Sequence, residues 1–320
     1  MTDNKQLHEI QTEQAQSPAN ASRKKTMPPK KRRRRLGDRK DGRRLRGITP
    51  MTRITPYIMP YRYDACNTFA DSINVSRVDD LCRRKVKQGM TNFSMLHVIL
   101  AAYIRTVSQR PALNRFVSGQ KIYARHNIEV NMVVKRKMTL DTPDACIKVI
   151  FDPTDTLDDV YEKFNKAVMD NKDEDGSNGT DKLNKVLLCI PGLLLRWTIK
   201  FIKFLDYFGW LPKFITNLSP FHGSMIITSM GSLGIKPIYH HLYEFGNLPV
   251  FIAYGAKRTV YEPDGEGKVH KRRYVDLKVV TDERICDGFY YASAFKLFRR
   301  ILEHPEQLEL PPEQVFEDVD

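Results

Sequence analysis

The basic residues of this 320-residue chain are concentrated near its N-terminus, which limits the part of the chain that can fold. Between Arg23 and Arg46 the sequence holds fourteen lysines and arginines against two aspartates, a local charge of +12, whereas the whole chain carries +14. The remainder is therefore nearly neutral, at +2. Residues 1–46 also hold almost no large apolar side chains, so they cannot bury enough surface to offset the entropy of ordering. We predict a disordered basic arm over 1–46 and one folded domain over 47–320.

The cysteines and the N-terminus indicate the compartment. Five cysteines are widely spaced and none forms a C-x-x-C pair. An odd number without a regular spacing favours a reducing compartment and argues against structural disulfides and a zinc site. The first sixteen residues are polar and contain no apolar signal core. These features predict a cytoplasmic protein without a bound metal.

Beyond the arm, the chain reads as a mixture of helices and strands. Residues 93–110 are apolar on every side, which predicts a buried helix that is capped by Thr91 or Asn92 and stopped by Pro111. Residues 120–134 alternate between apolar and polar side chains, which predicts one half-buried strand. Further strands are predicted at 145–151, 224–230, 249–258 and 272–281. These elements predict an α/β fold, an α+β two-layer sandwich with a mixed or antiparallel sheet.

Three segments resemble one family, in that family's order. Residues 92–134 contain a helix and a P-x-L-N turn, residues 223–258 begin with a glycine-rich strand, and residues 279–288 read VVTDERICDG. These are similar to the acyltransferase core of 2-oxo acid dehydrogenase complexes, whose motifs include G-T-F-T-I-S-N-L-G and D-H-R-x-x-D-G. Chloramphenicol acetyltransferases share the pattern H-x-x-x-D-G. The resemblance covers roughly Arg46 to the C-terminus. It implies the chloramphenicol-acetyltransferase-like fold, a CoA thioester as substrate, and a homotrimer with active sites between subunits.

The resemblance also implies a mechanism. In the family, the motif histidine removes a proton from a thiol or hydroxyl acceptor, which attacks an acyl-CoA thioester, while a Ser or Thr hydroxyl of a neighbouring subunit stabilises the oxyanion. Carried onto this sequence, the hydroxyl position falls on Thr228. The structural aspartate falls on Asp287, with Arg53 as its implied ion-pair partner. The position of the histidine falls on Glu283.

The glutamate at position 283 leaves the activity open. An ordinary glutamate is a weaker base than a histidine by about two pKa units, or roughly 3 kcal/mol in proton affinity, although burial can strengthen a carboxylate as a base. His240 or His241 could supply an imidazole, or both could be ordinary strand-end or surface residues. Cys286 fits a small apolar filler better than a nucleophile. We therefore expect a CoA-dependent acyltransferase or, alternatively, a catalytically impaired homologue with a binding or scaffold role.

Residues 185–221 form an apolar insertion relative to the family pattern and hold both tryptophans. Arg196, Lys200 and Lys203 are spaced so that they lie along one side of a helix. No uncharged run approaches ~18 residues, so we do not expect this segment to span a membrane. It could lie in a membrane interface, cover a tunnel for an acyl chain, or pack on its own domain or a second subunit.

The basic arm can bind polyanions through residues 23–46. An anionic membrane surface, nucleic acid and an acidic protein are all candidates, and a solvated tail is the alternative. The arm has no interleaved aromatic residues, which argues against specific nucleic-acid binding. It is too short to be a lipoyl domain, so we expect no covalent lipoyl group and an acceptor that comes from elsewhere. The sequence does not indicate which residues bind CoA. We expect a cytoplasmic protein, with a peripheral position at the membrane as an alternative.

Overall fold

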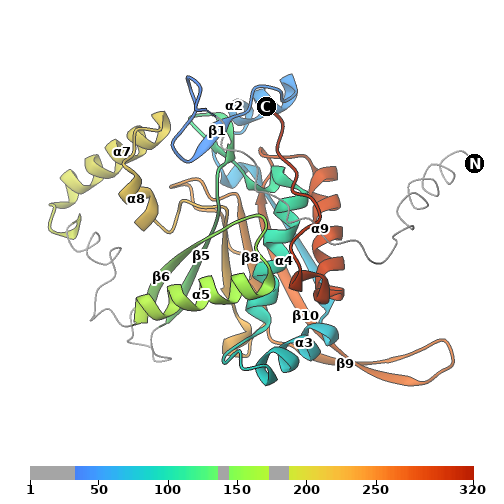
Figure 1. Cartoon of the computed structure of the whole chain (residues 1–320). Helices are drawn as coiled ribbons and strands as arrows, with labels where there is room; N and C mark the ends of the chain where they lie inside the picture. Colours follow the sequence, from blue (N-terminus) through green and yellow to red (C-terminus); the bar gives the residue numbers. More distant parts are fainter. Residues whose placement is uncertain (1–32, 136–143, 173–186) are drawn as a thin grey trace, which may run out of the picture.

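A computed structural model of the chain describes residues 33–135, 144–172 and 187–320 (Figure 1). Within them, the main sheet has seven strands in the order β2, β10, β8, β7, β5, β6, with β9 beside the first half of β10. The strands are β2 (Cys66–Asn74), β5 (Ile128–Lys135), β6 (Asp144–Phe151), β7 (Met225–Ser229), β8 (Val250–Tyr254), β9 (Arg258–Pro263) and β10 (Val269–Asp282). β5, β7 and β8 run parallel and the other pairs are antiparallel. The predicted α/β class with a mixed sheet is confirmed.

Helices pack on one face of this sheet and enclose the main core (Figure 1). They are α3 (Ser76–Lys87), α4 (Met95–Gln109), α5 (Leu157–Lys172) and α9 (Gly288–Glu303). α4 is buried nearly all round, as its sequence predicts, and it ends before Pro111. The predicted cap at Thr91 or Asn92 is wrong, because Asn92 lies in a left-handed turn (φ 64°) and Ser94 caps the helix together with His97.

A second, three-stranded sheet has the order β1, β4, β3. Its strands are β1 (Gly42–Arg44), β3 (Arg115–Ser118) and β4 (Lys121–Arg125). The single strand predicted over 120–134 is therefore wrong. The strand is interrupted at His126 and Asn127, and β4 and β5 belong to different sheets. Arg125 stands at the break and donates to the Asn247 side chain (2.8 Å). The alternating pattern continues through the break, so it could not reveal the change of partner strands.

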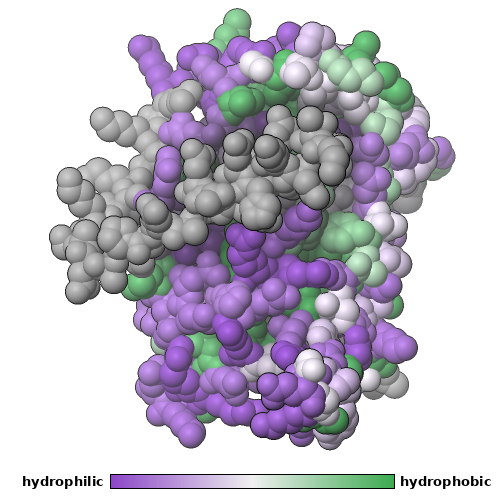
Figure 2. All heavy atoms as spheres, turned by 90° about the vertical axis from the view of Figure 1, so that its right-hand side faces the viewer, coloured by the Kyte–Doolittle hydropathy of each residue, from purple (hydrophilic) through white to green (hydrophobic). Residues whose placement is uncertain are grey.

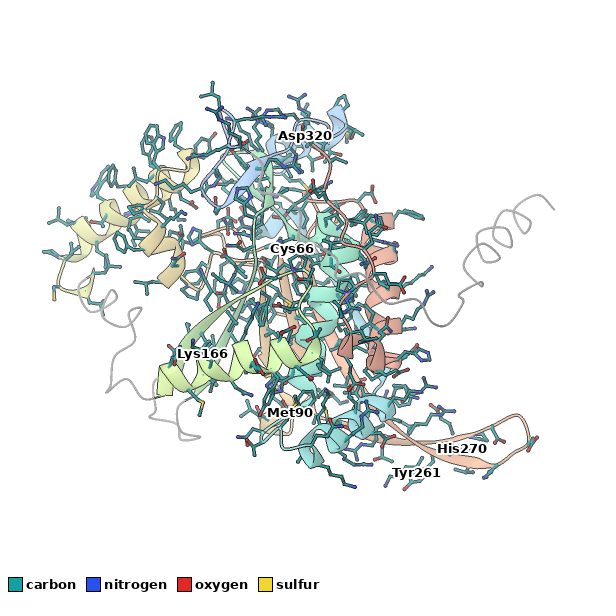
Figure 3. The ribbon with its side chains drawn as sticks, in the orientation of Figure 1. Cys66, Met90, Lys166, Tyr261, His270 and Asp320 are labelled. Atoms are coloured by element: carbon teal, nitrogen blue, oxygen red, sulfur yellow. The ribbon has the colours of Figure 1, made fainter. Side chains whose placement is uncertain are left out.

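Residues 33–46 are folded onto the domain, so the prediction of disorder as far as residue 46 is wrong for this part. β1 pairs with β4, and the buried Asp38 carboxylate accepts the backbone N–H groups of Arg35 (2.8 Å) and Arg44 (3.1 Å). Arg43 pairs with Asp320 near the C-terminus (2.9 Å), which lies beside β1 (Figure 3). Acidic partners within and beyond the basic run thus stabilise this segment. The rest of the predicted arm, 1–32, lies outside the described residues.

The apolar insertion, as far as the structure describes it, includes two of the helices between α5 and β7, at the left of Figure 1. They are α7 (Gly192–Phe208) and α8 (Lys213–Leu218). α2 (Pro50–Ile58) and four short 3-10 helices complete the described elements: η1 (Tyr63–Ala65), η2 (Pro111–Asn114), η3 (Gly231–Leu233) and η4 (Pro305–Glu309). None of the described helices combines the length and the apolar content that a membrane-spanning helix needs.

Candidate functional site

The turn between β10 and α9 carries Glu283 between two buried charged residues. Asp282 and Arg284 are 1% and 3% exposed and form a bidentate ion pair, with N–O distances of 2.8 and 2.7 Å. Buried Arg62 places its Nε 3.5 Å from the same carboxylate. Arg284 also donates to the Met59 carbonyl (3.0 Å). Buried ion pairs and hydrogen bonds therefore stabilise the turn, while Glu283 is exposed.

Electrostatics explains why this cluster is stable although it is buried. Burial lowers the pKa of Arg62, and neighbouring Arg284 lowers it further. Burial would also lower the pKa of Arg284, but the hydrogen bonds and charge of Asp282 outweigh burial and raise it. The Arg62 guanidinium donates to the Tyr243 carbonyl (2.5 Å) and the Gly246 carbonyl (3.1 Å), and the Arg62 backbone N–H donates to the Glu244 carboxylate (2.8 Å). Buried charges are tolerated when they are paired and hydrogen-bonded in this way. Sequence reasoning missed Arg62, which lies about 220 positions before the motif.

Glu283 itself has little support from its surroundings. Its N–H donates to the Ala65 carbonyl (2.8 Å), and none of the described residues bonds its carboxylate. Asp287 is exposed and caps α9, where it accepts the Tyr290 N–H (2.8 Å). The implied buried ion pair with Arg53 is wrong, because both residues are exposed and the Asp287 carboxylate binds a backbone N–H group in the first turn of α9 instead. Arg53 lies on α2, where it lines a cleft of about 310 Å³.

Thr228 is half-buried near the end of β7. In the sheet it stands beside Ala253 of β8, which stands beside Lys278 of β10. Glu283 follows Lys278 by five residues, so it lies about 17 Å further along the strand direction. One copy of the chain therefore does not bring Thr228 and Glu283 together.

The other residues considered for chemistry have structural surroundings. Cys286 is buried, and burial raises the pKa of its thiol to about 12, which agrees with the interpretation as a filler. His240 stacks on Phe251, with ring centres 4.5 Å apart. Its Nδ1 bonds with the carbonyl of exposed His241 (2.8 Å). These contacts favour ordinary packing for both histidines.

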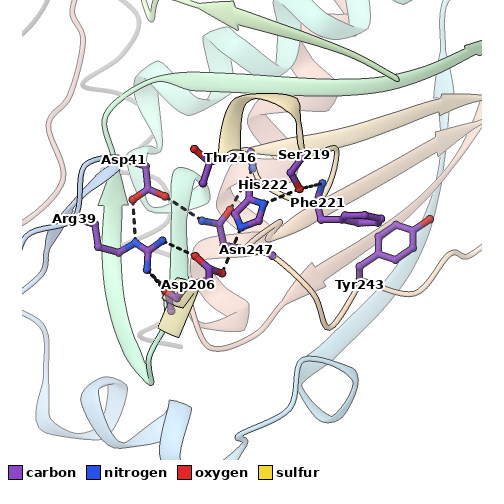
Figure 4. Close-up of polar contacts among 12 residues, drawn as sticks. Arg39, Asp41, Asp206, Thr216, Ser219, Phe221, His222, Tyr243 and Asn247 are labelled. Atoms are coloured by element: carbon purple, nitrogen blue, oxygen red, sulfur yellow. Dashed lines mark hydrogen bonds and ion pairs between the residues drawn. The ribbon is translucent and has the colours of Figure 1, made fainter. Parts of the chain in front are cut away.

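A second polar cluster, which sequence reasoning also missed, joins α7 to the segment before β7 (Figure 4). His222 Nδ1 lies 2.8 Å from Ser219 Oγ, and its Nε2 lies 3.3 Å from the Asp206 carboxylate. Arg39 pairs with the same carboxylate (2.8 Å). Burial would raise the pKa of Asp206, but His222 and Arg39 outweigh burial and hold it at about 2.

The order Ser, His, Asp in this cluster suggests a nucleophile, but the contacts indicate a structural role. Ser219 is 7% exposed, and its oxygen also accepts the Phe221 N–H (3.3 Å). Ser219, His222 and Asp206 thus link α7 to the loop before β7, and Asn131 of β5 links this loop to the main sheet. The cluster continues through Asp41, which accepts from Asn247 (3.2 Å). A cleft of about 200 Å³ borders the cluster and is lined by both Arg39 and His222.

No protein-family model matches the chain, and a search of curated proteins found no match. Among solved structures, a probable dihydrolipoamide acetyltransferase from Listeria monocytogenes gives a TM-score of 0.52 at 12% identity, over 82% of this chain and 95% of that chain. The dihydrolipoamide acetyltransferase of Azotobacter vinelandii gives 0.46 at 13% identity, over 83% of this chain and 94% of that chain. A chloramphenicol acetyltransferase gives 0.46 at 12% identity, over 77% and 92%. The chain shares the mixed α/β fold of the Listeria protein, and at this identity the likeness shows the fold alone.

Proposed function

We propose that the chain is a CoA-dependent acyltransferase, which moves an acyl group from a CoA thioester to a thiol or hydroxyl acceptor. Glu283 is the general base, Thr228 stabilises the oxyanion, and Asp287 fixes the start of α9. The observation that carries the proposal is the β10–α9 turn, in which the buried ion pair of Asp282 and Arg284 fixes the backbone on both sides of exposed Glu283. This is where the acyltransferase resemblance requires the base.

In this mechanism, the Glu283 carboxylate accepts the proton of the acceptor thiol or hydroxyl. The acceptor sulfur or oxygen then attacks the thioester carbonyl carbon, and the resulting oxyanion accepts a hydrogen bond from the Thr228 hydroxyl of a second copy. When the intermediate collapses, the carbon–sulfur bond to CoA breaks. The proton on Glu283 passes to the CoA thiolate, which restores the base. The steps need neither a metal nor a lipoyl group attached to this chain.

The proposal requires more than one copy of the chain. Within one copy, Glu283 lies about 17 Å beyond the level of Thr228 along the strand direction, too far for both to act on one carbonyl group. We therefore propose a homotrimer with a site at each subunit boundary. A boundary over the β10–α9 turn would also exclude water from Glu283. Carboxylates become stronger bases when they are removed from water, which would offset the disadvantage of glutamate relative to histidine.

The test measures free CoA and acylated acceptor by chromatography, with acetyl-, butyryl- and longer acyl-CoA as donors and dihydrolipoamide as acceptor. We expect Glu283→Gln to lower turnover by about 10²- to 10⁴-fold, since it removes the base. Thr228→Val should lower it by about 10²- to 10³-fold. Glu266→Gln, at the exposed tip of the β9–β10 hairpin, is the matched control and should leave turnover unchanged. Turnover that survives both site variants would contradict the mechanism.

A binding protein on the same fold is the second candidate. It is favoured by the Glu283 carboxylate, which no described side chain orients, whereas catalytic bases are commonly held by a third group. In that case, calorimetry should show CoA binding that is equal for the wild type and Glu283→Gln, with no turnover of any donor. Glu283→His then becomes informative, because turnover gained by this variant would show that the rest of the site is complete.

A further inference from the structure

α7 differs from a core helix because its largest apolar side chains are exposed. Of its 17 residues, all of which the structure describes, Asp206 alone is buried. Trp197 is 66% exposed and Phe201 is 59% exposed. α8 follows and buries none of its own residues, and nearby Trp210 and Phe214 are 61% and 60% exposed. The large apolar side chains of this segment thus face away from the core.

The side chains of α7 fall into three rows, because successive residues of an α-helix are about 100° apart around its axis. The row that faces the body contains one buried acid and half-buried aliphatic residues: Leu195, Ile199, Ile202, Leu205 and Asp206. The outer row is apolar and exposed: Leu193, Leu194, Trp197, Phe201, Phe204 and Phe208. A third row, exposed and basic, runs along one edge of the outer row: Arg196, Lys200 and Lys203. Apolar and cationic rows therefore lie side by side on one open surface, which we call the α7 surface.

The α7 surface is positive, with no exposed acid. Across 187–218, a stretch described throughout, the acidic side chain is Asp206, and it is turned inward to Arg39 (2.8 Å). Lys213 at the start of α8 adds a further exposed basic residue. Lys200 Nζ lies 4.9 Å from the ring centre of Trp197. A long lysine stem can lie along apolar surface while its ammonium group reaches a polar phase.

α7 is attached to the body at its C-terminal end by an ion pair and hydrogen bonds. Asp206 joins it to Arg39 and His222, and the Tyr207 hydroxyl donates to the Gln120 side chain (3.1 Å). Gly119, at φ 55°, lies so close that a Cβ there would collide with the Tyr207 carbonyl. The helix therefore presents its outer row in a fixed orientation. Its side chains project from the edge of the molecule (Figure 3), whereas the opposite side is mostly hydrophilic where grey atoms do not cover it (Figure 2).

We propose that the α7 surface docks the protein on an anionic lipid bilayer, with the aromatic row at the boundary of headgroups and acyl chains. Exposed Trp and Phe beside a basic row are what an interfacial helix needs. At about 25 Å, 17 helical residues are too short to span the apolar core of a bilayer. Two copies that met symmetrically through this surface would bring identical basic rows together, which disfavours a second copy as the occupant. Folded basic residues 33–46 are joined to α7 through Arg39 and add attraction to anionic lipid.

The two tryptophans of the chain are suitable probes, because Trp197 belongs to the α7 surface and exposed Trp210 stacks on Phe208 of that surface. The full-length protein is mixed with phosphatidylcholine vesicles, with and without phosphatidylglycerol, and tryptophan emission and co-sedimentation are measured. We expect a shift to shorter wavelength and quenching by lipids brominated on their acyl chains, both dependent on the anionic lipid. The joint variant Arg196→Glu, Lys200→Glu and Lys203→Glu should weaken binding at least tenfold. Phe201→Ser with Phe204→Ser should do the same while both tryptophans are kept.

The matched control lies on the β9–β10 hairpin, which exposes Tyr261 and a basic strand on the far side of the molecule from α7 (Figure 3). Joint charge reversal at Lys268, Lys271 and Arg272 should leave vesicle binding unchanged.

Three results would overturn the proposal. The first is tryptophan emission that is insensitive to anionic vesicles. The second is that the α7 variants bind vesicles as the wild type does, and that binding is lost only when the charges of Lys24, Lys25 and Lys30 are reversed. The third is a changed subunit number in sedimentation for the α7 variants with unchanged vesicle binding, which would assign the surface to a second copy. Membrane docking does not depend on acyl transfer, so a protein without acyltransferase activity would not contradict the docking proposal.

Discussion

α7 and α9 are amphipathic helices of similar length, 17 and 16 residues, yet α9 buries large aromatic side chains that α7 leaves exposed. α9 buries Tyr291, Ala294 and Phe298 against α4 and β2, whereas α7 buries Asp206 and leaves its aromatic row exposed. An amphipathic pattern therefore defines the two faces of a helix, but it does not determine which face points toward the body. The neighbouring groups decide this: α9 packs on an apolar core, whereas α7 is attached through Asp206 to Arg39 and His222, with half-buried aliphatic residues beside that acid.

The comparison predicts its largest effect for truncation of an aromatic residue in each helix. Phe298→Ala should lower the free energy of unfolding by about 3–5 kcal/mol, because it leaves a cavity in the core. Trp197→Ala removes a larger but exposed side chain and should change the free energy of unfolding by less than about 0.5 kcal/mol. Urea denaturation of both variants measures the difference. Similar losses in the two variants would mean that α7 is covered.

The next effect concerns the buried acid of α7. Asp206→Ala should cost about 2–3 kcal/mol of unfolding free energy, because Arg39 and His222 lose a partner away from water, although Arg39 keeps Asp41. Asp170→Ala, at an exposed position on α5, is the control and should change stability by less than about 0.5 kcal/mol. If the two alanine variants unfold alike, the Asp206 cluster does not hold α7.

The same carboxylate predicts a dependence of stability on pH. His222 and Arg39 outweigh burial and hold the pKa of Asp206 at about 2, against an ordinary value of 3.8. The pKa is depressed on folding, so the stabilisation is fully present above about pH 4 and is lost as the pH falls through about 2. It amounts to about 2 kcal/mol. The difference in unfolding free energy between the wild type and Asp206→Asn should therefore shrink by about this amount between pH 5 and pH 2. A difference that stays constant with pH would argue against an ion pair.

The smallest effect concerns reactivity, with no change in stability. Each helix is preceded by a cysteine: Cys286 is buried before α9, with its thiol pKa raised by burial to about 12, and Cys189 is exposed before α7. Iodoacetamide should modify Cys189 at least about a hundred times faster than Cys286, because the thiolate is the reactive form. Peptide mass spectrometry over a time course gives both rates. Comparable rates would show that the β10–α9 turn opens readily.

The fold could be predicted because its signals are contiguous in sequence. The helix over 93–110, the strands around Thr228 and Lys278, and the DERICDG turn each carry their pattern within a few residues, and their order along the chain matches the acyltransferase core. Asp282 and Arg284 belong to that same turn, but Arg62 does not. No local pattern links Arg62 to a carboxylate that comes so much later in the chain.

The predictions that failed each depended on a partner from elsewhere in the fold. The strand over 120–134 divides because β4 pairs with β1 and β5 pairs with β7. Residues 33–46 fold because Arg39 forms an ion pair with Asp206 and Arg43 forms one with Asp320. Arg53 does not reach Asp287, which caps its own helix. The Asp206–His222 contact had no sequence signal, since a single histidine and a single aspartate of an apolar segment form no motif.

By itself, the sequence determined the class of fold, the place of Glu283 in a tight turn, and the two faces of α7. Periodicity and turn chemistry act between neighbouring residues, so they can be read without knowing the partners. The tertiary structure alone decided that Glu283 faces water between two buried charges, that Thr228 belongs to another part of the sheet, and that α7 turns its acid inward. These outcomes depend on which distant groups share a buried space, because an unpaired charge there costs more free energy than an exposed aromatic side chain.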